Sequence, residues 1–165
     1  MSKARFIGTL DFAPQDAKHP DIWTLERDFG FLRSDGLLII ALEKGRTDGA
    51  SIPRPCWRFV GHPFYRKNRF WALPHDAGYR GYAIIVDTRL FPHTPIEWLF
   101  ENWADLPAHA FIHSADLPRK FWDNTLLQAM RALGEIWLKR FVVYRSVRLF
   151  GWASYKPKSP VFRSA

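Results

Sequence analysis

Two apolar runs separated by a short polar turn constrain the fold of this chain most strongly. The runs lie within residues 22–42, and Ser34-Asp35-Gly36 stands between them. A break of this kind between loosely alternating apolar residues is typical of a β-hairpin. We therefore expect a hairpin in the N-terminal quarter of the chain. Nothing after about residue 55 has an equally clear strand pattern.

Three later segments have the pattern of helices. The first covers residues 65–84, either as one helix bent at Pro74 or as a helix that begins there, because proline disrupts a helix interior and is tolerated in a first turn. The second covers residues 118–133, and the third covers residues 136–150. The expected fold class is therefore mainly α (α+β), with an N-terminal β-hairpin followed by long, roughly antiparallel helices.

The length and composition predict a single domain. The chain has 165 residues, 47% of them hydrophobic, which suits one packed core. We expect one globular domain over residues 1–155, with an irregular, proline-rich insertion at about residues 86–116. The last ten residues, 156–165, should form an extended or disordered tail. Cys56 is the only cysteine, which excludes an internal disulfide and a thiolate metal cluster within one chain.

Charge and hydropathy limit the partners. The formal net charge of +8 favours anionic partners, namely nucleic acid, a phospholipid surface or an acidic protein. Arg131, Arg140, Arg145 and Arg148 could follow one side of the C-terminal helices, but no nucleic-acid motif accompanies them, so nucleic acid is the unfavoured partner. No run approaches the roughly 18 apolar residues of a membrane span, and the N-terminus leads into no signal-like run.

The aromatic residues of the insertion have two interpretations. Trp98, Phe100, Trp103 and Phe111 fit contact with a lipid interface, and burial against a neighbouring subunit explains them equally well. A homo-oligomer is therefore compatible with the sequence.

The segment around His75 carries the chemistry. His75 and Tyr79 are four residues apart and would share one helical face, with Asp76 at its side. Asp123, on the helix at 118–133, would face the core and need a partner, and an antiparallel neighbour could supply His75. We expect His75 to donate a hydrogen bond to Asp123, which would fix the tautomer of the ring, and the other ring nitrogen would take a proton from water.

A cation is the remaining part of this hypothesis. Asp76 would hold a divalent ion, with further oxygen ligands from Asp48 or the carbonyls of residues 47–51. Oxygen ligands in flexible geometry suit Ca²⁺, which could polarise an ester carbonyl. The plainer alternatives stay open: His75 packs in the core beside a capping Asp76, Asp123 is a solvated carboxylate, and Asp48 bonds backbone amides in its turn.

The residues from His75 to Arg80 resemble the catalytic helix of the phospholipase A2 superfamily, especially its small prokaryotic branch. The shared pattern is His-Asp, two residues, then Tyr-Arg. The resemblance implies that His75 is the base, Asp123 its orienting carboxylate, Asp76 the cation ligand and Tyr79 a support for Asp123. The glycine-rich calcium loop and the helix-bridging cysteines of the secreted enzymes are missing.

A longer resemblance links the chain to a family of uncharacterised phage and prophage proteins (DUF1353). It covers roughly residues 20–152: a hairpin, a Thr-Asp-x-Ala-Ser-x-Pro-Arg loop, a tryptophan, the His-Asp helix and a later Asp helix, closed by Tyr-x-x-Val-Arg-x-x-Gly. Here these features are residues 47–54, Trp57, His75-Asp76, Asp123 with Met130, and Tyr144, Val147, Arg148 and Gly151. Members often lie among phage structural genes, which implies a virion or tail-assembly context.

Together these observations predict a phage or prophage protein with a phospholipase A2-like hydrolase site, located in the virion or the host cytoplasm. Its partners would be other phage structural proteins or an anionic phospholipid surface. The alternative is a non-catalytic virion or tail component that keeps the same scaffold for protein contacts.

Overall fold

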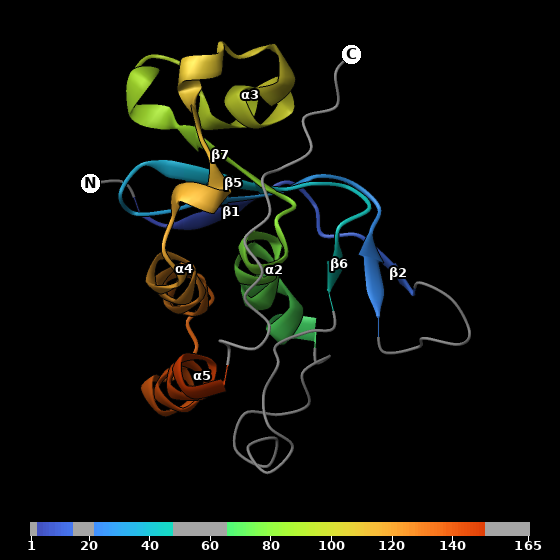
Figure 1. Cartoon of the computed structure of the whole chain (residues 1–165), viewed down its shortest axis with the longest axis vertical. Helices are drawn as coiled ribbons and strands as arrows, with labels where there is room; N and C mark the ends of the chain where they lie inside the picture. The colour runs from blue at the N-terminus through green and yellow to red at the C-terminus, as the bar shows by residue number, and fades with distance from the viewer. Residues whose placement is uncertain (1–2, 15–21, 48–65, 151–165) are drawn as a thin grey trace.

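An antiparallel sheet lies between two layers of helix. The computed structural model describes residues 3–14, 22–47 and 66–150. In this part of the chain, five strands form the main sheet in the order β1-β4-β5-β7-β8. Their bounds are Arg5–Ile7, Phe29–Leu32, Leu37–Ala41, Ala83–Asp87 and Phe111–Ile112. The sheet crosses the middle of the molecule (Figure 1).

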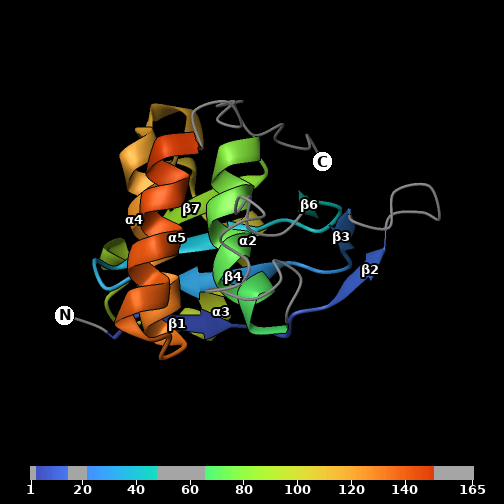
Figure 2. The ribbon, with the colours of Figure 1, turned by 90° about the horizontal axis from the view of Figure 1, so that it is seen from below.

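The two faces of this sheet are covered by different helices. Helices α2 (Arg66–Arg80) and α4 (Arg119–Ala132) cover one face, and α5 (Trp137–Phe150) lies outside them (Figures 1 and 2). The short helix α3 (Ile96–Glu101) and four one-turn 3-10 helices belong to residues 88–116; α3 covers the opposite face. None of the described helices combines the length and the hydropathy that crossing a membrane requires.

A smaller antiparallel sheet stands at one end of the molecule, in the order β2-β3-β6. Its strands are Phe12–Pro14, Trp23–Leu25 and Arg46–Thr47. Thr47 ends β6 beside helix α2, and the chain from Asp48 to residue 65 lies outside the described residues, as does the expected tail at 156–165.

Strands β4 and β5 form a hairpin around Gly36, which has a φ of 84°. Every residue of both strands is buried, because both faces of the sheet are covered. Phe31 and Ile39 belong to the cluster beneath α2 and α4, whereas Leu38 and Ile40 belong to the cluster beneath α3.

The expectation of a mainly α, phospholipase A2-like fold is wrong, because the hairpin is only two strands of a central five-stranded sheet. The decisive element is β7, which pairs with β5 and β8. We expected helix as far as residue 84, but α2 ends at Arg80. Gly81 has a φ of 76°, and the Tyr82 amide donates to the Ala77 carbonyl, which is the bonding of a glycine helix stop.

Residues 83–87 favour a strand because of their residue types, although they lack the alternation of apolar and polar residues that indicates a strand. The run is continuously apolar from Ala83 to Val86 and rich in β-branched side chains. A strand covered on both faces loses the alternation of a half-exposed strand and cannot be told from a buried helix by pattern alone. The segment at 86–116, expected as an insertion, thus begins within this central strand and includes β8.

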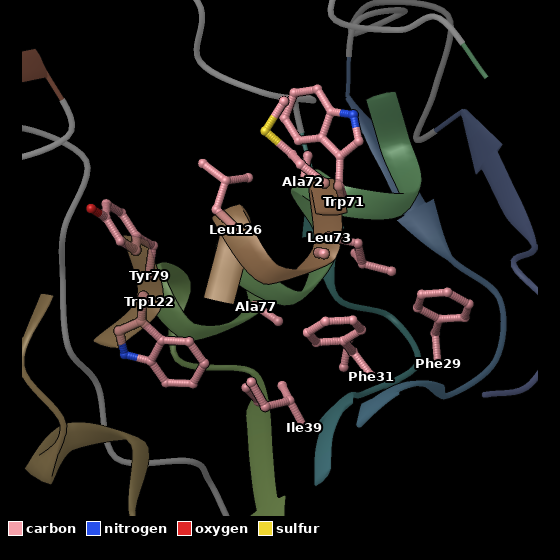
Figure 3. Packing of buried hydrophobic residues seen from close by; sticks show 14 of the residues in the cluster. Phe29, Phe31, Ile39, Trp71, Ala72, Leu73, Ala77, Tyr79, Trp122 and Leu126 are labelled. Carbon is pink, nitrogen blue, oxygen red and sulfur yellow. The ribbon is translucent and has the colours of Figure 1, made fainter. Parts of the chain in front are cut away.

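The core between the sheet and the helices is aromatic. Phe29 and Phe31 of the sheet, Trp71 of α2 and Trp122 of α4 belong to one buried cluster, and the two indole rings lie apart within it (Figure 3). Gly78 allows α2 and α4 to approach, because a Cβ atom there would lie 2.1 Å from the Trp122 ring. This close approach brings Tyr79 of α2 next to Asp123 of α4.

The aromatic residues of the segment at 86–116 have mixed roles. Phe100, Trp103 and Phe111 are partly buried against the cluster beneath α3, and the Trp103 indole donates to Asp28 at 2.8 Å. Trp98 remains 48% exposed.

Candidate active site

Helix α2 provides three polar residues of the site. It continues through Pro74 without ending, so His75, Asp76 and Tyr79 all lie on one regular helix. His75 and Tyr79 share a face as their spacing requires, and their ring centroids are 4.0 Å apart. All three side chains are buried. Local sequence alone therefore orients the imidazole against the phenol ring.

Asp123 of α4 lies opposite this pair and is fully buried. One of its oxygens, Oδ1, accepts a hydrogen bond from the Tyr79 hydroxyl. The same oxygen lies 3.5 Å from Nε2 of His75, which is an ion-pair distance, but Nε2 makes no hydrogen bond, so the expected Asp123–His75 hydrogen bond is absent from the described residues. Tyr79 and Asp123 thus hold each other beside the imidazole.

The second oxygen of Asp123 faces two arginines. Arg148 of α5 donates from Nη1 to Oδ2 at 2.8 Å, and Nε of Arg119, one turn earlier on α4, lies 3.8 Å from the same oxygen. A buried carboxylate is costly unless such partners compensate its charge. Asp123 therefore joins all three helices of this layer.

Asp76 faces the other side of the imidazole. Its Oδ1 lies 3.1 Å from Nδ1 of His75, and its Oδ2 accepts a hydrogen bond of 2.6 Å from the Thr47 hydroxyl. The imidazole is consequently placed between two carboxylates, one near each ring nitrogen. This arrangement favours the doubly protonated, cationic ring.

The titration of the site follows from these contacts. Burial lowers the pKa of His75, but the adjacent carboxylates of Asp123 and Asp76 outweigh burial and raise the pKa above its ordinary 6.5. Burial raises the pKa of Asp123, but the nearby His75 ring and the hydrogen bonds from Arg148 and Tyr79 outweigh burial and lower the pKa below 3.8. Burial, reinforced by Asp123, raises the pKa of the Tyr79 hydroxyl far above 10.0.

The sequence comparison matches residues 23–147 to the family described as "Protein of unknown function (DUF1353)". The chain belongs to this family. The matched region includes His75, Asp76, Tyr79 and Asp123, and it ends one residue before Arg148. No curated protein and no solved structure matches the chain.

In this DUF1353 protein the structure brings together four of the five predicted site residues: His75, Asp76, Tyr79 and Asp123. The fifth, Asp48, lies outside the described residues. It directly follows Thr47, whose hydroxyl bonds Asp76.

Three contacts of the site were missed by sequence reasoning. Arg119 precedes Asp123 by four residues, a spacing that places both on one helical face. Arg148 belongs to the closing Tyr-x-x-Val-Arg pattern, but its sequence context indicates only one member of a cationic series. Thr47 opens the loop pattern that contains Asp48. Arg148 and Thr47 each belong to a sequence pattern, but neither pattern indicates that Arg148 binds Asp123 or that Thr47 binds Asp76.

The described residues contain no group of three or more His, Cys, Asp or Glu side chains placed to hold a metal ion. Asp76 alone supplies a carboxylate on the Nδ1 side of the imidazole, and Ca²⁺ takes six to eight oxygen ligands. A calcium site here would therefore need ligands from the segment that begins at Asp48.

Proposed function

We propose that this protein is a hydrolase that uses His75 as a general base to activate water against an ester. The observation that carries the proposal is the imidazole placed between Asp76 and Asp123, with Tyr79 holding Asp123. A histidine with one oriented and one catalytic nitrogen, beside a second carboxylate, is a recurring arrangement for base catalysis. The resemblance to phospholipase A2 makes a phospholipid ester the first substrate to test.

The protonation state of His75 would control the reaction. The cationic ring cannot accept a proton, so the resting arrangement between two carboxylates is the inactive form. After deprotonation, the ring would keep its proton on Nε2, which lies 3.5 Å from Asp123, and the lone pair on Nδ1 can accept a proton from water. The Nδ1 lone pair would repel Oδ1 of Asp76. Because this oxygen would then lose its hydrogen bond from His75, it could bind a cation.

The proposed reaction includes a calcium ion bound by Asp76. Asp76 would be one ligand and Asp48 another, and the ion would supply positive charge to a carbonyl oxygen as it becomes an oxyanion. Asp123 cannot take part in binding, because Tyr79, Arg148 and Arg119 already surround it.

A second function is favoured by the same contacts. Both ring nitrogens face carboxylates, and Asp123 links α2, α4 and α5, so the cluster could serve as a buried polar joint in a non-catalytic protein. In this alternative the protein is a virion or tail component that assembles with other phage structural proteins.

The deciding experiment measures fatty-acid release from mixed anionic phospholipid vesicles, with calcium and with a chelator. Wild-type protein should release fatty acid, His75→Ala should not, and His93→Ala, which removes an exposed histidine, should match the wild type. Loss of release in the chelator supports the calcium ligand at Asp76, whereas undiminished release removes calcium from the proposal. A folded wild type that releases nothing favours the structural role.

A further inference from the structure

Helix α5 exposes an apolar face on the outside of the molecule. Trp137 is 68% exposed, Phe141 52% and Leu149 65%, and Leu138 is exposed beside them. At 100° per residue these side chains fall on one face with Arg145, opposite the buried Val143 and Val147. We define Trp137, Leu138, Phe141, Arg145 and Leu149 as the outer α5 face.

Large apolar side chains rarely stay grouped on a surface without a partner. Helix α5 is the outermost helix of its layer, farthest from the sheet (Figure 1). The outer α5 face is therefore exposed at both ends and at the middle of the helix, which suits a flat partner better than an inserted peptide.

The charges of α5 specify an anionic partner. The helix contains no Asp or Glu. Of its four cations, Lys139 binds Asn68 and Glu135, and Arg148 binds Asp123 although its side chain stays 37% exposed. Arg145 lies at the centre of the outer α5 face, with its guanidinium 5.3 Å from the Phe141 ring centroid. An arginine among Trp, Phe and Leu is compatible with a helix that lies in the headgroup region of a membrane.

A second copy of the chain fits this face less well. A helix of 14 residues is about 21 Å long, and an exposed stripe about 10 Å wide offers roughly 200 Å². A stable protein interface buries roughly 800 Å² on each partner. Each copy also carries a formal charge of +8, which opposes self-association.

We propose that the outer α5 face binds the surface of an anionic phospholipid bilayer. The helix would lie parallel to the bilayer, with Trp137 and Phe141 at the level of the headgroups and Arg145 beside lipid phosphates. The surface would bring the proposed hydrolase to its lipid substrate. Only this catalytic consequence rests on the proposed function. Membrane binding itself requires no catalysis.

Vesicle co-sedimentation tests the proposal with purified full-length protein. Wild-type protein should bind vesicles of mixed phosphatidylglycerol and phosphatidylcholine, and bind pure phosphatidylcholine much more weakly. The Trp137→Ala/Phe141→Ala variant should lose about tenfold or more in partitioning, and Arg145→Gln about fivefold. Trp98→Ala is the matched control, because Trp98 is also exposed but lies on α3, beyond the opposite face of the sheet. It should bind like the wild type.

Several outcomes would overturn the proposal. These are a wild type that does not sediment with anionic vesicles, α5 variants that bind as tightly as the wild type, and equal binding to neutral vesicles. A wild-type dimer in analytical ultracentrifugation that becomes monomeric in Trp137→Ala/Phe141→Ala would show that a second copy covers the face.

The same samples separate this proposal from the hydrolase. His75→Ala should sediment like the wild type, since His75 is buried away from the outer α5 face. Binding without fatty-acid release refutes only the hydrolase, and fatty-acid release with binding unchanged in the α5 variants refutes only the membrane surface.

Discussion

Arg148 of α5 donates a hydrogen bond of 2.8 Å to Oδ2 of Asp123 on α4, while the other oxygen of Asp123 receives the hydroxyl of Tyr79 on α2. One buried carboxylate therefore connects three helices, and it does so beside His75. The geometry of the imidazole and the stability of the helical layer depend on the same residue.

Replacing Asp123 should destabilise the protein strongly. Asp123→Asn leaves the buried His75 imidazolium and the partly exposed Arg148 without their shared negative charge, and the loss of such a partner costs about 1–3 kcal/mol. Urea unfolding followed by circular dichroism measures the effect. Asp105→Asn, an exposed carboxylate on the other side of the sheet, should stay within about 0.5 kcal/mol of the wild type. Equal stability of the two variants would contradict the structural role given to Asp123.

The site also predicts how stability varies with pH. The pKa of His75 is raised on folding, so its contribution is complete below 6.5 and is lost as the pH rises through the folded-state value. The pKa of Asp123 is lowered, so its contribution is complete above 3.8 and is lost as the pH falls through its folded-state value. The cluster should stabilise the protein most between pH 3.8 and pH 6.5, where both contributions are complete.

Urea midpoints at a series of pH values test this prediction. The alkaline decrease should be smaller in His75→Gln than in the wild type, because glutamine does not titrate. An identical alkaline slope in both proteins would show that another group causes it.

Removing the Tyr79 hydroxyl should raise the pKa of His75 further. In Tyr79→Phe the ring still packs against the imidazole, but Oδ1 of Asp123 loses its donor, and its negative charge then acts more fully on His75. Histidine resonances followed by NMR through a pH titration report the change. A lowered or unchanged pKa would mean that Tyr79 does not share the charge of Asp123.

Gly78→Ala should separate α2 from α4. The added Cβ would lie 2.1 Å from the Trp122 ring, and overpacking of a core costs about 1–3 kcal/mol even when the helix gains a better helix former. Gly134→Ala is a useful comparison: its φ of 70° strains an alanine, but its Cβ would meet no atom within 4 Å. We expect Gly78→Ala, unlike Gly134→Ala, to perturb the His75 resonances as well as the unfolding midpoint.

The site was more predictable from sequence than the fold that carries it. The i, i+4 spacing of His75 and Tyr79 needs only a helix, and a core-facing Asp123 needs a polar partner; both arguments are local. The missed strand β7 depends on coverage of both sheet faces, which no local pattern records. Arg148 reaches Asp123 across 25 positions of sequence through the turn between α4 and α5, and its cationic neighbours made it look like part of a solvated face.

The pH dependence of ester hydrolysis tests the central claim most directly. Fatty-acid release from anionic vesicles should be measured from about pH 5 to about pH 9, with wild type and with His75→Ala checked for folding at each pH. The account predicts a rate that rises with pH above 6.5, through the raised pKa of His75, and no release by His75→Ala at any pH. No release by folded wild type, or equal release by His75→Ala, would contradict it.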